Sequence, residues 1–246
     1  MKNIRLNISD NDFLKIFLIK DYSLLWFSSF TSMLSMQIRI IATGFILYDI
    51  TGSGLSLGML GIIQLFFQLP SILYGGVLAD FFKRTTIITI SQSFGTVVIF
   101  ILFYLTATEL INEWHIYIST ALLSINSTIG GPARSALTAN LVPKKLLINA
   151  VAANTATMQI GSVAAPILFG LFTVSFGASY PLLIGSIAAL ISAITCILIK
   201  NDNYIKNTKK MSPIKNIIEG FIYVKEHPIL PGLYLLDIGV TVVSFY

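Results

Sequence analysis

The chain has 246 residues, of which 55% are hydrophobic and 11% are charged, and its formal net charge is +5. This composition is far from that of soluble domains and indicates a membrane protein. Attraction to a membrane surface accounts for the basic excess, so no nucleic-acid partner is expected. The chain has a single cysteine, Cys196, which excludes a disulfide framework within it. Because Cys196 lies in an apolar stretch, its thiol is expected to be buried and inert.

Six apolar stretches alternate with short polar loops along the chain. They are Leu24–Tyr48, Leu55–Ala79, Thr86–Thr106, Trp114–Thr138, Val151–Phe176 and Pro181–Ile199. At about 1.5 Å per residue, each is long enough to cross a hydrocarbon core of about 30 Å. A backbone in lipid must satisfy its own hydrogen bonds, so the sequence predicts an all-α membrane protein with six transmembrane helices.

The basic residues fall on one side of this alternation. They precede the first stretch, occur at Lys83–Arg84 and Lys144–Lys145, and follow the sixth stretch, whereas the loops at 49–54, 107–113 and 177–180 have no Lys or Arg. Cytoplasmic loops carry an excess of Lys and Arg in such proteins. We therefore expect a multi-pass protein of the bacterial cytoplasmic (inner) membrane whose N-terminus is cytoplasmic.

The composition changes after the sixth stretch. We expect residues 1–199 to form the six-helix transmembrane domain and residues 200–230 to form a cytoplasmic linker. Apolar residues spaced three or four apart over Pro213–Glu226 predict an amphipathic helix on the inner membrane surface within that linker. Residues 231–246 are expected to be the truncated start of a second transmembrane domain. The apolar run that begins at Gly232 would form a seventh helix of about 22 Å, which is too short to span a membrane comfortably.

A few polar residues lie deep in the apolar stretches. Gln37 and Arg39 lie in the first stretch and Asn126 in the fourth. An arginine at membrane depth is costly, so Arg39 is expected to face a polar cavity or a partner. Gln64 and Gln68 share a helix face and fit a cavity lining or hydrogen bonding between helices equally well.

Asp237 is the one acidic residue inside a predicted span. A carboxyl group within a membrane is suited to carry a proton. Asp237 also lies near the start of the last apolar run, close to the inner surface. A hydrated aspartate without a role in proton transfer fits this position equally well. We assign Gln37, Arg39, Asn126 and Asp237 to a candidate substrate and proton pathway.

No catalytic arrangement is evident in the sequence. It has no glycine-rich phosphate-binding loop followed by Lys and Ser or Thr, so no ATP-driven pump is expected from this chain alone. His115 and His227 are predicted on opposite sides of the membrane, which argues against a paired metal site. We expect neither an enzyme nor a bound cofactor.

The loop after the second stretch carries the most specific motif. Residues 76–84 read Gly-Val-Leu-Ala-Asp-Phe-Phe-Lys-Arg, which resembles the signature Gly-x-Leu-Ala-Asp-Arg-x-Gly-Arg of major facilitator superfamily transporters. Phe81 and Lys83 depart from that pattern. Gly76 permits close helix approach, and Asp80 and Arg84, four apart, can pair at a helix end. The resemblance implies that this loop latches the two halves of a transporter in one state of its cycle.

The fifth stretch contains a second motif. Residues 161–170 read Gly-Ser-Val-Ala-Ala-Pro-Ile-Leu-Phe-Gly and resemble the superfamily's antiporter motif at Gly161, Pro166 and Gly170. Ala165 and Phe169 replace two of its glycines. The resemblance implies export rather than uptake, whereas generic packing of small residues is the alternative.

A third segment resembles one branch of the superfamily. Residues 131–136 read Gly-Pro-Ala-Arg-Ser-Ala and precede Val142 and Pro143, as in the drug and siderophore exporters that include the enterobactin exporter and the macrolide efflux proteins. Arg134 lies near the cytoplasmic end of this helix. We expect it to extend toward the surface or to pair with Asp80, in preference to contacting substrate.

These likenesses imply the first half of a secondary active transporter that exports amphipathic small molecules, such as drugs or siderophores, by proton-coupled alternating access. The expected energy source is the proton gradient, and the partners are the lipid bilayer, the substrate and a missing C-terminal half. The alternatives are a non-transporting scaffold or assembly subunit, an inactive gene fragment, and an uptake symporter of the same superfamily. A gene fragment, a split gene and a homodimer would each explain the short final run, and we expect no transport by the 246 residues alone.

Overall fold

The computed structural model describes residues 10–81 and 83–200, together with positions 227, 230–233, 236–237 and 239; for residues 10–12 and 72–81 it describes the backbone alone. The chain divides into two units, Met1–Lys206 and Asn207–Tyr246. The amphipathic helix expected at Pro213–Glu226 lies outside the described residues.

The first unit is a bundle of helices. Its elements are α1 (Asp10–Lys15), η1 (Ile16–Leu18), α2 (Lys20–Thr51), α3 (Gly54–Phe81), α4 (Arg84–Ala107), α5 (Glu113–Leu141), η2 (Lys144–Leu146), α6 (Leu147–Phe176) and α7 (Tyr180–Ile197). The described residues contain no strand. The six long helices α2 to α7 coincide with the six predicted stretches, so the all-α fold class is confirmed.

Most of these helices are also apolar enough to cross a membrane. Within the described residues, five candidate spans meet this criterion by length and composition, namely Lys20–Thr51, Gly54–Ser71, Arg84–Ala107, Lys144–Phe176 and Tyr180–Ile197. The exception is α5, which has 29 residues but carries amide, hydroxyl and guanidinium groups along its length. Its length still corresponds to about 40 Å, enough to cross the membrane, and several of its polar groups bind other helices of the bundle.

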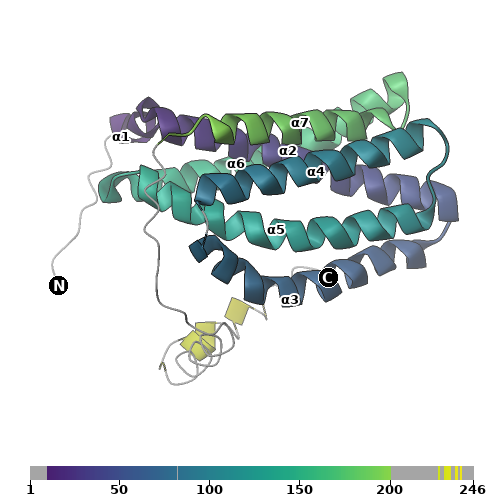
Figure 1. The fold of residues 1–246 in the computed structure, drawn as a ribbon, viewed down its shortest axis with the longest axis horizontal. Coiled ribbons are helices and arrows are strands. Elements are labelled where there is room, and N and C mark those ends of the chain that lie inside the picture. The colour runs from purple at the N-terminus through teal and green to yellow at the C-terminus, as the bar shows by residue number, and fades with distance from the viewer. Residues whose placement is uncertain are drawn as a thin grey trace. The chain divides into compact units, whose positions relative to one another are not determined.

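The long helices run in alternating directions and pack side by side (Figure 1). Helix α2 packs against α6 and α7, α4 packs against α5 and α7, and α3 packs against α5. This alternation brings the lysine-bearing start of α2 and the α3–α4 and α5–α6 junctions toward the same end of the bundle. Among the described residues, Lys20, Lys83, Arg84, Lys144 and Lys145 therefore lie toward one end of the bundle, as the charge pattern predicts.

At the opposite end of the bundle, local hydrogen bonds define the end of α2 and the start of α5. Gly52 adopts a left-handed conformation with φ 63° and donates its backbone N–H to the Tyr48 carbonyl at 2.8 Å, which terminates α2. At the start of α5, His115 donates its backbone N–H to Asn112 Oδ1 at 3.2 Å, and Asn112 donates its own to His115 Nδ1 at 3.1 Å. This capping box occupies His115 with a local structural role.

The small residues of α6 let it approach α2 closely. A Cβ atom added at Gly161 would lie 3.0 Å from Met33 Cγ. Four residues on, Ala165 is fully buried. Phe169, which stands where the antiporter motif has glycine, packs edge-on against Phe45 with ring centroids 5.5 Å apart. The residues of the motif therefore form part of the α2–α6 contact.

We predict that Gly161→Val destabilises the protein by about 1–3 kcal/mol, because the added atoms would overlap the Met33 side chain. Gly170→Val is the matched control, since it lies in the same helix and nothing lies within 4 Å of its added Cβ. Thermal unfolding of both variants in detergent tests the difference. Equal stability of the two variants would contradict the close α2–α6 contact.

Candidate functional site

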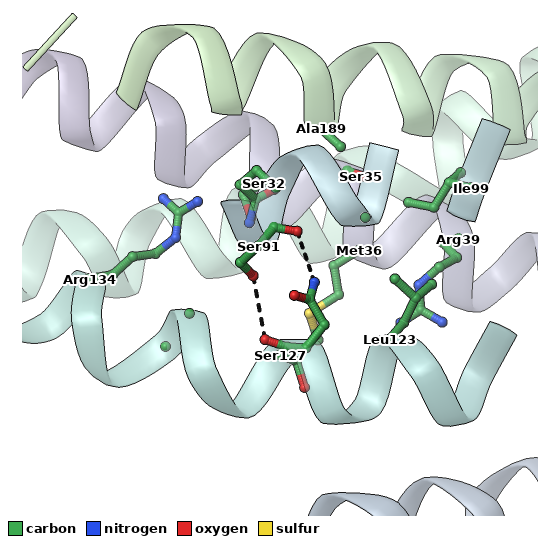
Figure 2. Close-up of a pocket in the computed structure, with 15 residues that line it drawn as sticks. Ser32, Ser35, Met36, Arg39, Ser91, Ile99, Leu123, Ser127, Arg134 and Ala189 are labelled. Carbon is green, nitrogen blue, oxygen red and sulfur yellow. Dashed lines mark hydrogen bonds between the residues drawn. The ribbon is translucent and has the colours of Figure 1, made fainter. Parts of the chain in front are cut away.

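A cavity of about 210 Å³ lies inside the first unit among α2, α4, α5 and α7 (Figure 2). It is lined by Ser32, Ser35, Met36, Arg39, Ser91, Gln92, Gly95, Ile99, Leu123, Asn126, Ser127, Gly130, Gly131, Arg134 and Ala189. Three of these, Met36, Ser127 and Gly131, are exposed, so the cavity opens to the bundle surface between α2 and α5. Pockets for drug-sized ligands measure about 300–1,000 Å³, so this one has room for a small molecule or for part of a larger one.

One face of α2 supplies the polar side of this cavity. Ser28, Ser32, Ser35 and Arg39 follow one another at helical spacing and therefore lie on the same face. Gln37 is offset from Arg39 by about 200° around the helix and is half-buried outside the cavity lining. Of the two pathway residues predicted in α2, the structure brings Arg39 to the cavity and places Gln37 elsewhere.

Helices α4 and α5 meet at a polar contact in the cavity wall. Asn126 Nδ2 donates to the Ser91 carbonyl at 2.9 Å, and Ser91 Oγ donates to the Asn126 carbonyl at 3.4 Å. A Cβ atom at Gly130 would lie 3.1 Å from Ser91 Oγ, so the glycine makes room for this contact. Asn126 is thus held in one orientation. Asn126 was predicted to line the pathway, whereas Ser91 and the neighbouring Gln92 were not.

Arg134 binds three hydroxyl groups from two other helices. Its Nη1 donates to Ser28 Oγ at 3.3 Å and to Ser29 Oγ at 3.0 Å, and its Nη2 donates to Ser192 Oγ at 3.1 Å. Ser192 Oγ also donates to the Ser28 carbonyl at 2.7 Å. We call Arg134, Ser28, Ser29 and Ser192 the serine–arginine cluster. It joins α5 to α2 and α7.

Arg39 differs from Arg134 in its partners. Its backbone carbonyl accepts from Thr43 Oγ1 at 2.8 Å. Arg39 lines the cavity together with the apolar residues Met36 and Leu123. Within the part of the chain that the structure describes, the guanidinium donates no hydrogen bond and has no carboxylate partner. The cavity therefore contains a cation whose hydrogen-bonding capacity the described bundle leaves unused.

The remaining predicted site residues are not among the described residues that line this cavity. Arg84 Nη1 donates to the Ala136 carbonyl at 3.0 Å, which ties the start of α4 to the end of α5. Gly76 and Asp80 belong to the end of α3, where the side chains lie outside the described residues, so the Asp80–Arg84 pair stays a prediction. Pro166 and Gly170 lie within α6. Asp237 belongs to the second unit.

We predict energetic coupling inside the serine–arginine cluster. In a double-mutant cycle, Arg134→Gln and Ser29→Ala should couple by about 0.6 kcal/mol, a typical value for hydrogen bonds between membrane helices. The stability of the two single variants and the double variant in detergent gives this value. Ser162→Ala is the control partner, because Ser162 donates only within α6, to the Gln159 carbonyl at 2.8 Å. Coupling no larger than that of the control would show that the Arg134–Ser29 contact is not formed.

Comparison with known proteins agrees with this architecture. Residues 25–246 match the Major Facilitator Superfamily. The chain is also 25% identical over 178 residues to YfiS of Bacillus subtilis (strain 168), described as an uncharacterized MFS-type transporter. That alignment covers 70% of this chain and 42% of YfiS, so the chain spans less than half of this relative's length. A helical bundle of this form and a family match over nearly the whole chain establish that it belongs to the major facilitator superfamily.

Proposed function

We propose that this chain is part of a proton-coupled exporter of amphipathic small molecules, such as drugs or siderophores, that works by alternating access. In transporters of this superfamily, two related bundles rock against each other around a site near the middle of the membrane. The described six-helix bundle supplies one such unit. The basic end of the bundle would face the cytoplasm, as the asymmetry of Lys and Arg indicates.

The observation that carries the proposal is the mixed chemistry of the cavity. Arg39 and Asn126 provide charged and amide groups, while Met36, Ile99 and Leu123 provide apolar surface on the same cavity. Placing a polar residue at membrane depth costs free energy. Such residues therefore usually pair with another group or line a substrate pathway. Such a lining suits a solute that has both an apolar body and a polar group.

Export, as opposed to uptake, is supported by sequence likeness. The segment that includes Gly161, Pro166 and Gly170 resembles the antiporter motif, and the segment around Arg134 resembles drug and siderophore exporters. The structure gives Gly161 a packing role against α2, which a transporter of either direction could use. The direction of transport is therefore the first quantity to measure.

We predict that cells producing the transporter that contains this chain accumulate less of an amphipathic dye than cells without it, with the cation ethidium and the anion fluorescein measured side by side. Collapse of the proton gradient with an uncoupler should remove the difference, because the gradient supplies the energy. The control is dye accumulation in cells that carry the empty vector and are treated with the same uncoupler. Dye uptake driven by an inward proton gradient would indicate a symporter, and no energised flux of any tested solute would indicate a scaffold.

We also predict that Asp80→Asn slows transport while membrane levels stay normal. A partly solvated ion pair at the helix ends is worth roughly 1 kcal/mol, so its loss should change the conformational equilibrium by about fivefold without unfolding the bundle. Asp49→Asn is the control, because it makes the same chemical change at an exposed residue near the C-terminal end of α2. This variant should transport normally. Disappearance of the Asp80→Asn protein from the membrane would assign Asp80 a role in folding.

A further inference from the structure

We propose that the cavity binds the anionic group of an organic solute through the Arg39 guanidinium. The inference rests on the proposed function to the extent that this solute is the one transported. It narrows the expected substrates from amphipathic molecules in general to those that carry a carboxylate or a similar anion.

The charges around the cavity favour an anion. Among the residues that the structure describes, its lining contains two guanidinium groups, those of Arg39 and Arg134, and no aspartate or glutamate. The other polar lining groups are hydroxyls and amides, which carry no net charge. A cation that is partly removed from water is stabilised by a counter-charge brought close to it. A bound anion would therefore be favoured over a bound cation at this position.

Arg39 and Arg134 differ in their capacity to bind an anion. The Nη atoms of Arg134 already donate to Ser28, Ser29 and Ser192. Ser29 and Arg39 are about ten residues apart on α2, or about 15 Å along the axis, and Figure 2 shows the two guanidinium groups well separated. A small anion can therefore contact only one of them. Arg39 lines the cavity, and among the described residues its guanidinium donates no hydrogen bond.

The surroundings of Arg39 indicate what else the solute carries. Met36, Ile99 and Leu123 line the cavity together with Arg39. Apolar side chains of this kind gain from contact with a hydrocarbon body and gain nothing from a hydrated inorganic ion. A cavity of about 150 Å³ is known to hold benzene. At about 210 Å³, this cavity has room for a ring that bears a charged group.

Three ring compounds of similar size test the assignment, namely benzoate, benzamide and benzylamine, which are anionic, neutral and cationic. Binding to the purified chain in a non-ionic detergent is followed by the shift in its melting temperature. Benzoate should bind at least about tenfold more tightly than the other two, because a hydrogen bond to a charged group adds about that factor. Equal binding of benzamide or benzylamine would overturn the inference.

Arg39→Gln should weaken benzoate binding by about tenfold or more, and Arg39→Lys should retain part of the affinity. Lys145→Gln removes the same charge at an exposed position in η2 and should bind benzoate as the wild type does. The melting temperature of each variant without ligand verifies its folding. Undiminished benzoate binding by a folded Arg39→Gln protein would contradict the proposal.

Two further measurements distinguish solute binding at Arg39 from lipid binding and from transport itself. Phosphatidylglycerol added to the detergent should leave benzoate binding unchanged; displacement of benzoate that depends on Arg39 would assign the site to a lipid headgroup and overturn the solute proposal. Efflux of either dye without any benzoate binding would overturn the inference and leave the exporter proposal standing. Benzoate binding without energised flux of any solute would support the inference and contradict the exporter proposal.

Discussion

A polar side chain inside a membrane bundle must find its partner among the neighbouring helices, because the lipid hydrocarbon provides none. Much of the first unit's packing follows from this constraint. Ser28 of α2 and Ser192 of α7 exchange hydrogen bonds, and Arg134 of α5 adds its guanidinium to the same cluster. Small residues such as Gly161 bring the helix backbones close enough for side-chain contacts of this type.

The same constraint separates structural polar groups from candidate functional ones. Asn126 and Arg134 line the cavity but already bind neighbouring helices, so they fix the shape of its wall. Arg39 lines the same cavity and has no such partner among the described residues. Its charge is therefore available for a molecule that enters the cavity. This contrast between two arginines of one bundle is what singles out Arg39 as the candidate binding group.

Hydrophobicity alone predicted the helices well and their ends less well. The stretch expected at Leu24–Tyr48 is extended to Lys20–Thr51 in the structure, because the helix continues into its polar flanks and ends at the left-handed Gly52. The fourth stretch was predicted as a helix despite being the most polar. Its amide and guanidinium groups point to other helices, a fact that average hydropathy does not record.

The cavity was predicted only in part. Arg39 stood out because a charge at membrane depth is rare, and Asn126 stood out as a deep amide. The helical angle between Gln37 and Arg39 already implied that only one of them could face a given cavity. Ser91 gave no comparable signal, since a serine in a membrane helix often binds its own backbone, and the amide of Gln92 was not assigned to the pathway. Their place in the cavity depends on how α4 packs against α5.

The central claim is that the cavity that opens between α2 and α5 is hydrated. Labelling of introduced cysteines with a water-soluble thiol reagent tests this claim. Cys196, the single cysteine of the sequence, is buried and gives a silent background. Ser127→Cys places a thiol at the cavity opening, and Val97→Cys places one on an exposed apolar face of α4. In membrane vesicles, a membrane-impermeant methanethiosulfonate should label Ser127→Cys rapidly and Val97→Cys slowly. Equal labelling of the two, or faster labelling of Val97→Cys, would contradict the account.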